Sequence, residues 1–513
     1  MKKFLILGCA LLFAVSCGTY YIAHEMSYPT YGNQFEYEEY QKITENDFLD
    51  VTSNPLSTFS IDVDAASYSN VRRFINNNQL PPKDAIRVEE MINYFSYDYP
   101  SPENDQPFSI TTEMGVCPWE SSHQLVHIGL KGQEIKTEDL PPSNIVFLLD
   151  VSGSMDMPNK LPLLKSGFRL LVDQLRKKDR VAIVTYAGYS GLALPPTPGD
   201  KKEKIIEAIN NLRAGGSTAG AAGINTAYET AEENFIASGN NRVVLATDGD
   251  FNVGVSSDDA LVELIEQKRE KGIYLTVLGF GTGNLKDSKM EKLADKGNGN
   301  YAYIDNILEA KKVLVSEFGG TMYTIAKDVK LQIEFNPTKV SAYRLIGYEN
   351  RLLKKEDFTD DTKDAGELGS GHTVTALYEV IPVGIESHQA KIDTLKYQAM
   401  GIKPEALIGN ELMTIKFRYK KPHETESRLI TQTVIEVNQT LDALSNNFRF
   451  SAAVAELGLL LRDSKFKGNA SYQSALKLAK GAKGDDEAGY RGEFIRLVEA
   501  CELLSKDFAK KDK

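Results

Sequence analysis

A carboxylate and two hydroxyls stand at alternate positions directly after an apolar run. The run is Ile145–Leu149, and the polar residues are Asp150, Ser152 and Ser154. An unbroken apolar run of this length is typical of a strand buried on both faces of a parallel sheet. Ligands of open α/β sheets bind just beyond the carboxyl ends of such strands. Because oxygen ligands suit a hard divalent cation, this segment predicts a magnesium site.

Two further segments supply the remaining oxygen ligands. A glycine-rich loop, Arg213–Gly220, carries the hydroxyl of Thr218, and a second apolar run, Val243–Ala246, leads to the carboxylate of Asp248. Serine, threonine and aspartate also cap helices, so D-x-S-x-S alone would be a weak signal. Three segments in this order, two of them closing apolar strands, favour a metal site over helix caps.

Together the three segments resemble the metal-ion-dependent adhesion site of von Willebrand factor A (VWA) domains, whose pattern is D-x-S-x-S, then Thr, then Asp. All five positions match: Asp150, Ser152, Ser154, Thr218 and Asp248. The resemblance implies that the hydroxyls bind Mg²⁺ directly, with Mn²⁺ or Ca²⁺ as alternatives, while one or both carboxylates act through water. It also implies an open coordination position that takes an Asp or Glu carboxylate from another protein.

Two other motifs overlap these residues, but the sequence departs from each of them at required positions. Asp248–Val253 begins like an EF-hand loop, but its sixth position is Val253 instead of glycine, and a buried strand precedes it. Gly215–Ala219 approaches G-x-S-x-G, but it ends in alanine and follows no strand. No histidine lies between Asn144 and Met322, so a serine nucleophile would lack a nearby base. We therefore do not expect an enzyme.

The amino terminus predicts export and a lipid anchor. Met1–Lys3 is basic, and Phe4–Val15 is apolar and too short to span a bilayer. The residues before Cys17 resemble a bacterial lipoprotein box in which Cys17 is acylated after cleavage, and an ordinary signal peptide with an incidental cysteine is the alternative. No other segment approaches the ~18 consecutive apolar residues of a membrane helix. We expect an exported protein, lipid-anchored to the cell envelope, with the outer membrane favoured.

The composition fits a large folded protein outside the cell. Its 513 residues predict more than one domain, and a hydrophobic content of 42% is ample for real cores. The net charge of -12 argues against nucleic acid and against electrostatic adsorption to anionic lipid. Besides Cys17, the mature chain keeps Cys117 and Cys501, either as free buried thiols or as a disulfide pair.

Strand patterns lie on both sides of the VWA segment, which predicts a β-sandwich with the VWA domain inserted in it. The predicted fold class is α/β: a doubly wound, Rossmann-like VWA domain in a β-sandwich, with small helical N-terminal and C-terminal regions. The expected divisions are signal peptide 1–16, tether 17–54, N-terminal α/β region 55–100, first sandwich segment 105–135, VWA domain 141–322, second sandwich segment 325–440 and C-terminal helical region 441–513.

Three polar sets outside the metal motif have plainer explanations. Asp62 and Asp64 could bind a second cation, but a helix cap at Asp64 and an interdomain hydrogen bond at Asp62 are favoured. His123 and His127 share one face of a predicted strand and are expected to face solvent. The acidic segment 360–367 is expected to be a solvated loop.

Ser60–Asp64 and Glu89–Phe95 resemble the amino-terminal domain of the YfbK-like family of bacterial VWA lipoproteins, and the carboxyl-terminal region resembles its matching domain. This resemblance implies architecture more than function. Our leading hypothesis is a lipid-anchored protein whose metal site binds an envelope protein through an acidic residue of that partner. The alternative is a structural envelope protein in which the metal only braces the VWA loops and the other domains bind.

Cys17→Ser should move the protein from the membrane fraction to the soluble fraction. Acyl chains contribute about 0.8 kcal/mol per buried CH₂, and no membrane-spanning helix is predicted to replace them. Fractionation with a salt wash measures the change, and Cys9→Ser, in the earlier Ile6–Cys9 segment, is the matched control that should stay in the membrane. A Cys17→Ser protein that resists salt wash in the pellet would contradict lipid anchoring.

Overall fold

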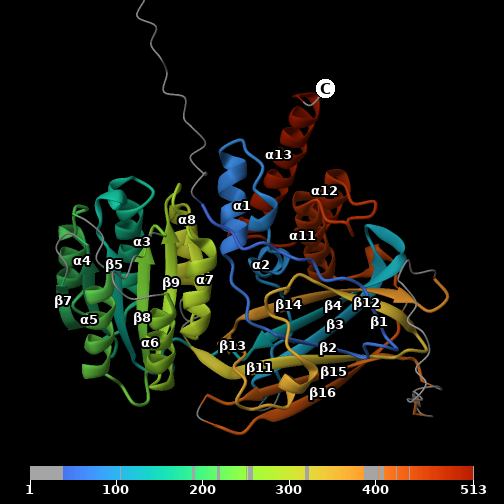
Figure 1. The fold of residues 1–513 in the computed structure, drawn as a ribbon, viewed down its shortest axis with the longest axis horizontal. Coiled ribbons are helices and arrows are strands. Elements are labelled where there is room, and N and C mark those ends of the chain that lie inside the picture. The colour runs from blue at the N-terminus through green and yellow to red at the C-terminus, as the bar shows by residue number, and fades with distance from the viewer. Residues whose placement is uncertain are drawn as a thin grey trace, which may run out of the picture.

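The computed structural model comprises three regions, which Figure 1 shows as a VWA domain at the left, a β-sandwich at the lower right and helices above the sandwich. Among the described helices, none has the length and hydropathy that crossing a bilayer requires. The structure describes residues 38–103, 106–187, 191–216, 220–249, 251, 258–317, 323–385, 402–403, 409–422, 424–437 and 439–511.

The VWA domain is built on a six-stranded sheet of order β10-β9-β8-β5-β6-β7, in which only the edge strand β7 runs antiparallel. The strands are β5 (Ser143–Asp150), β6 (Arg180–Tyr186), β7 (Gly191–Pro198), β8 (Asn240–Thr247), β9 (Ile273–Phe280) and β10 (Tyr301–Ile304). The helices are α3 (Leu161–Gln174), α4 (Lys202–Asn211), α5 (Gly220–Glu233), α6 (Asp258–Glu270), α7 (Asp287–Lys296) and α8 (Ile307–Lys311).

Helices cover both faces of this sheet, and each face has its own apolar core. Val146 and Leu148 of β5 face α5, α6 and α7, while Phe147 and Leu149 face α3, α4 and α8. Successive side chains of a strand point to opposite faces, so the unbroken apolar run of β5 supplies both cores.

The β-sandwich holds the VWA domain between its strands β4 and β11. One sheet has the order β1-β12-β14-β4-β3, and the other has the order β13-β11-β15-β16 with β2 also paired to β11. Apolar side chains of both sheets form a single core. The strands are β1 (Leu49–Asp50), β2 (Leu56–Ser60), β3 (Phe108–Cys117), β4 (Glu120–Gly132), β11 (Thr324–Phe335), β12 (Val340–Ile346), β13 (Gly366–Gly369), β14 (Thr373–Pro382), β15 (Glu411–Lys420) and β16 (Arg428–Ile435).

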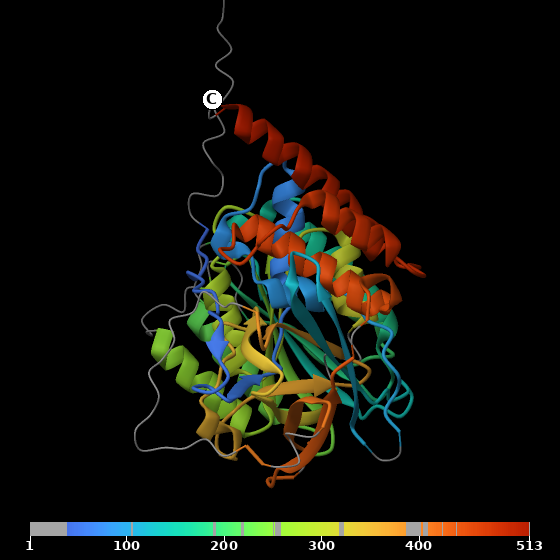
Figure 2. The ribbon, with the colours of Figure 1, turned by 90° about the vertical axis from the view of Figure 1, so that its right-hand side faces the viewer.

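Helices from both ends of the chain form one layer on the outer face of the first sheet. They are α1 (Ala66–Asn76), α2 (Val88–Asn93), α11 (Asn446–Arg462), α12 (Tyr472–Gly481) and α13 (Tyr490–Lys511). Their shared core includes Leu125 of β4 and Leu377 of β14. Figure 2 shows α11, α12 and α13 crossing together above the sandwich. The predicted fold class is therefore confirmed.

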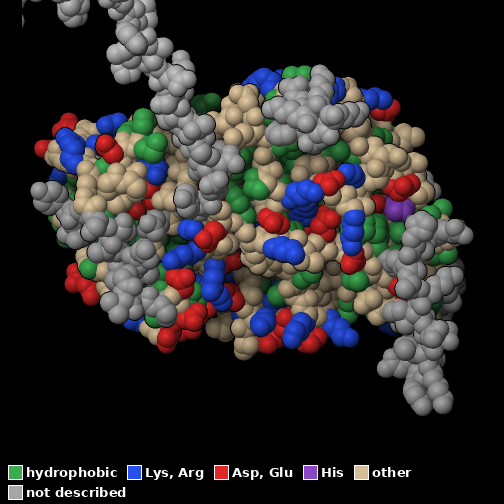
Figure 3. Space-filling model, turned by 45° about the horizontal axis from the view of Figure 1, so that its top comes forward, with side chains coloured by type: hydrophobic (Ala, Val, Ile, Leu, Met, Phe, Trp, Pro, Cys, Tyr) green, Lys and Arg blue, Asp and Glu red, His purple; other side chains and the backbone are tan. Residues whose placement is uncertain are grey.

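Charged side chains of both signs are interspersed on the face drawn in Figure 3, where lysines and arginines lie next to aspartates and glutamates. Exposed ion pairs of the described chain include Lys83 with Asp463 and Lys480 with Glu499. Exposed pairs of this kind contribute little to stability, so their main consequence is a mixed and solvated surface.

The structure differs from the expected tether over residues 38–54, which pack against the folded body. The Glu39 N–H donates to the Leu285 carbonyl of the VWA domain at 2.9 Å, and β1 pairs with β12 of the sandwich. Arg73 of α1 holds the Glu38 carboxylate through two hydrogen bonds of 2.8 Å. Residues 17–37 lie outside the described residues, Cys17 among them.

The two histidines of β4 do not face solvent as expected. His127 is fully buried and contacts the Tyr99 hydroxyl at 2.7 Å and the Ser451 hydroxyl at 3.0 Å, while His123 lies 2.6 Å from a Glu379 carboxylate oxygen. The outer face of this sheet is covered by the helical layer, which the strand pattern alone did not reveal. Cys117 and Cys501 are both buried free thiols.

Acid should destabilise the protein through His127. Burial lowers the pKa of this histidine to about 3, so the folded state stays neutral while the unfolded chain binds a proton near its ordinary pKa. The free energy of unfolding of wild type, relative to His127→Gln, should fall by roughly 2 kcal/mol between about pH 8 and about pH 5. Urea unfolding of both proteins at each pH measures this difference, and a value independent of pH would contradict a neutral buried His127.

Candidate metal centre

The predicted site residues meet at the carboxyl end of the VWA sheet. Asp150 is the last residue of β5, and Asp248 directly follows β8. These two strands are parallel neighbours, with Leu149 opposite Ala246, so their carboxyl ends reach the same edge of the sheet. This is the edge at which open α/β sheets bind their ligands.

Asp150 is a buried carboxylate that no cation of the described chain neutralises. Its relative exposure is 0%, and burial raises its pKa. One oxygen accepts the Ser152 N–H at 2.8 Å, and the other accepts the Tyr186 hydroxyl at 3.0 Å and the Thr247 hydroxyl at 3.4 Å. Among described residues no lysine or arginine forms an ion pair with it. These neutral donors orient the carboxylate but leave its charge unpaired.

The two serine hydroxyls converge beside this carboxylate. The Oγ atoms of Ser152 and Ser154 lie 2.9 Å apart, with Ser152 buried and Ser154 exposed. Gly216 of the glycine-rich loop lies beside this turn, because its carbonyl accepts the Gly153 N–H at 3.3 Å. Thr218, two residues further on, lies outside the described residues. The site therefore opens to solvent at Ser154 and is closed on its inner side by Asp150.

Asp248 is the second carboxylate, and it already has a cationic partner. Lys160 Nζ lies 2.8 Å from Asp248 Oδ2, and both side chains are buried. Desolvation opposes ionisation of Asp248, but hydrogen bonds from Lys160, Ser154 and Asn284 outweigh it, and the pKa is lowered. Asp248 is therefore ionised at neutral pH. Sequence reasoning missed Lys160, which carries no motif and lies just before α3, 88 residues from its partner.

The donor set fits a divalent cation. Two carboxylates and one ammonium leave one negative charge unpaired, and that charge lies on Asp150, which is fully buried. An uncompensated buried carboxylate is costly, and a bound cation removes this cost. The hydroxyls of Ser152 and Ser154 supply the hard oxygen ligands that Mg²⁺ prefers.

The turn after Asp248 packs closely against the 284–286 loop. Gly249 has a φ of +108°, and a Cβ at this position would lie 2.5 Å from the Asn284 carbonyl oxygen. Only glycine adopts such a backbone readily while allowing this approach. The loop that it touches also carries the Leu285 carbonyl, which accepts the N–H of Glu39. The packed amino-terminal segment therefore lies directly behind the metal turn.

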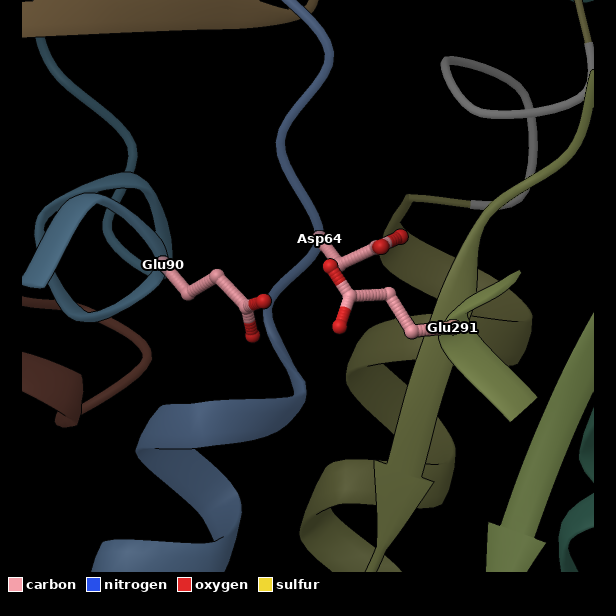
Figure 4. Close-up of side chains that lie close together, drawn as sticks. All are labelled: Asp64, Glu90 and Glu291. Carbon is pink, nitrogen blue, oxygen red and sulfur yellow. The ribbon is translucent and has the colours of Figure 1, made fainter. Parts of the chain in front are cut away.

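A second group of carboxylates lies where α1, α2 and α7 meet. Figure 4 shows Asp64, in the segment before α1, Glu90 of α2 and Glu291 of α7 close together, and one oxygen from each lies within 4.8 Å of the others. Two arginines already pair with them: Arg87 with Glu90 and Glu291, and Arg351 with Asp64 and Glu291. The two arginines already neutralise much of the negative charge of this group, so it needs no metal ion. We call these three carboxylates and two arginines the ionic joint, because they connect the VWA domain to the rest of the chain.

Asp64 belongs to this joint and does not cap α1. The N-cap residue of α1 is Ala65, which has no side-chain cap, and Asp64 instead accepts the Tyr301 N–H of β10 at 2.6 Å. The expected helix cap at Asp64 is therefore wrong. Asp62, for which an interdomain hydrogen bond was expected, lies 3.3 Å from Arg351.

Three family models match the chain. The von Willebrand factor type A domain matches residues 144–314, a model described as von Willebrand factor matches residues 34–127, and the carboxyl-terminal model of the uncharacterized protein YfbK matches residues 320–504. The VWA match covers the strands that carry Asp150 and Asp248.

Individual proteins and solved structures are also similar to this chain. The uncharacterized protein YfbK of Escherichia coli (strain K12) is 44% identical over 470 residues, which cover 90% of this chain and 81% of that protein. A magnesium-chelatase 67 kDa subunit of Chlorobaculum tepidum is 26% identical over 227 residues, covering 38% of this chain and 36% of that protein. The solved structure of a von Willebrand factor type A protein from Catenulispora acidiphila covers 74% of this chain and 88% of its own, with 16% identity and a TM-score of 0.40. The identity to YfbK, carried across nearly the whole chain, shows that this protein belongs to the YfbK family of VWA-domain proteins.

Proposed function

We propose that this protein is a lipid-anchored envelope protein that binds a protein partner through a divalent cation held by the VWA domain. Asp150, Ser152, Ser154, Thr218 and Asp248 would hold the cation, and Cys17 would carry the lipid. The observation that carries the proposal is the fully buried Asp150 carboxylate, which lacks a cationic partner among the described residues and lies next to two converging hydroxyls.

The charges around the site favour an acidic partner. A divalent cation added to Asp150, Asp248 and Lys160 gives a net positive site, because the lysine already offsets one of the two carboxylates. Ser154 is exposed, so the site can be reached from solvent. A carboxylate from a partner would supply the missing negative charge, and Mg²⁺ accepts such an oxygen in place of a water. VWA domains as a family have interaction and adhesion roles, which agrees with this arrangement.

The alternative function is a structural one, in which the cation only braces the loops and the sandwich or helical layer binds the partner. The tight packing of Gly249 against the 284–286 loop favours such bracing, because it links the metal turn to the packed amino-terminal segment. The two functions differ in whether the open face of the metal site contacts the partner. Measurements of partner affinity and of stability can therefore distinguish them.

Asp150→Ala should abolish stabilisation by magnesium. In wild type, Mg²⁺ at about 100 times its Kd should add about 2.7 kcal/mol to the free energy of unfolding, because the ion binds only the folded state. Differential scanning calorimetry with and without Mg²⁺ measures this effect, and Asp248→Ala should behave like Asp150→Ala. Asp200→Ala, which removes an exposed carboxylate of the same domain, is the matched control and should keep the full response. If neither Mg²⁺ nor Mn²⁺ changes the melting temperature or gives calorimetric heat in wild type, the metal proposal is wrong.

Thr218→Ala should separate the two functions. In the adhesion function, loss of this hydroxyl should weaken binding of the partner recovered from envelope extract by about tenfold or more, while the melting temperature changes little. In the bracing function, the same change should lower the melting temperature and leave partner affinity intact in the folded protein. Both quantities are measured on one preparation, with chelator-treated wild type as the reference. Unchanged affinity in a folded variant that has lost its ion would refute the adhesion function.

A further inference from the structure

A polar cavity lies at the opposite end of the VWA sheet from the metal site. It has a volume of about 200 Å³ and is lined by the VWA domain, the sandwich and the segment Ser60–Val63. β13 lies at the end of the sandwich next to the VWA domain, as Figure 1 shows. The polar side chains that line the cavity include Arg242, Asn298, Asn300, Thr324, Arg351 and Glu367.

Arg242 of β8 is buried in this cavity wall without an anionic partner. It is 1% exposed, donates one hydrogen bond of 2.8 Å to the Thr276 hydroxyl, and lies over the Tyr274 ring at 5.5 Å. Its Nε has no hydrogen-bond partner, and no carboxylate of the described chain forms an ion pair with it at 4.0 Å or less. Burial lowers the pKa of Arg242, and the charge of Glu367 only partly opposes this change. A buried guanidinium with so few partners raises the free energy of the folded state unless an anion pairs with it.

Other buried arginines at this junction are built differently. Arg87 contacts the carboxylates of Glu90 and Asp287, and Arg351 contacts several carboxylates that include Asp295. The fold therefore surrounds these guanidinium groups with anions while leaving Arg242 without one among the described residues. Arg242 is therefore left with the charge of Glu367, which acts on it without a direct contact, and with room for a further anion.

Glu367 of β13 is the opposite charge in the same cavity, and it has no cationic partner within the described chain. Its carboxylate accepts hydrogen bonds from Asn298 at 3.0 Å and from the Thr324 hydroxyl at 2.5 Å, and no lysine or arginine of the described residues pairs with it. Desolvation raises its pKa, and the charge of Arg242 works against this rise without a direct contact. The expected solvated loop at 360–367 is thus wrong for Glu367, which faces the cavity.

The remaining charges of the cavity wall are already paired. Asp62 and Asp295 contact Arg351, and Asp364 contacts Arg269 at 2.6 Å. Burial lowers the pKa of His372, so it is neutral at neutral pH. Of the charged side chains described in this wall, only Arg242 and Glu367 are left, one positive and one negative. Each acts on the charge of the other, but they form no ion pair at 4.0 Å or less.

We propose that this cavity binds a small zwitterion of the α-amino-acid class, whose carboxylate pairs with Arg242 and whose ammonium group pairs with Glu367. A simple anion would leave Glu367 without a cation, and a simple cation would leave Arg242 without an anion. A ligand with both charges satisfies both groups at once. The volume is below the roughly 300–1,000 Å³ of sites for drug-sized ligands, so the ligand must be small. Asn298, Asn300 and Thr324 supply further polar contacts.

The twenty L-amino acids, added singly to the full-length protein in detergent, test this proposal, with acetate and methylamine as single-charge controls. At least one amino acid should raise the melting temperature and give saturable heat in titration calorimetry, while acetate and methylamine should not. Arg242→Met and Glu367→Gln should each weaken that binding by more than about tenfold. Asp364→Asn is the matched control, because this carboxylate lines the same cavity but is paired with Arg269, and it should bind like wild type.

Arg242→Met also distinguishes a ligand site from a purely structural arginine. Methionine fills most of the same space without a buried charge, so the ligand-free variant should melt at or above the wild-type temperature. A lower melting temperature, with no amino acid binding to wild type, would show that Arg242 is structural and would overturn the proposal. Binding that persists in both variants, binding of acetate alone, or a wild type that binds no amino acid would each overturn it as well. If Arg242→Met does not fold, Glu367→Gln carries the same test.

Discussion

The arrangement of the whole chain depends on buried arginines that join its three regions. Arg87, the N-cap residue of α2, pairs with Glu90 of α2 and with Asp287 of α7, and Arg351 of the sandwich pairs with Asp64 and Asp295. Breaking a buried ion pair costs about 3–5 kcal/mol, whereas an intact pair contributes little net stability. We infer that this joint fixes the orientation of the inserted VWA domain more than it stabilises the fold. Burial raises the pKa of Glu90 to about 7, so its contribution to stability is present in acid and is lost as the pH rises through that value, opposite to the effect of His127.

The sequence predicted those elements whose apolar pattern is local, and it missed those whose stability comes from distant partners. The strands β5 and β8 were predicted because a strand buried on both faces must be apolar throughout. β7 was missed because it contains three prolines, which an antiparallel edge strand tolerates since its outer N–H groups need no partner. α7 was missed because only Met290, Leu293 and Ala294 form its apolar side, while Asp287 and Glu291 pair with the arginines of the ionic joint. These two charged residues are buried through ion pairs, which an apolar pattern does not reveal.

The same distinction divides the candidate sites. Asp150 and Asp248 were predicted because each closes an apolar strand, and the parallel pairing of those strands brings them together. Lys160 gave no signal, because its role depends on a contact with Asp248 that the fold alone creates. Arg242 and Glu367 lie on different domains, 125 residues apart, so no motif joins them. Functional residues at strand ends can be read from local pattern, whereas those in an interdomain cavity require the assembled structure.

β8 carries both candidate sites at its two ends, and their surroundings suit different ligands. The metal turn at Gly249 packs against the loop that receives the Glu39 N–H, so the chain leaves toward its amino terminus from directly behind the metal site. With Cys17 as the proposed anchor, the residues up to position 38 reach at most about 75 Å when fully extended. Such an anchor would restrict the metal site to the neighbourhood of the membrane, where a surface-held protein partner could reach it. Arg242 lies about 20 Å away, toward the amino-terminal end of β8, in a cavity between the domains. A cavity of about 200 Å³ suits a small diffusible zwitterion better than a protein surface.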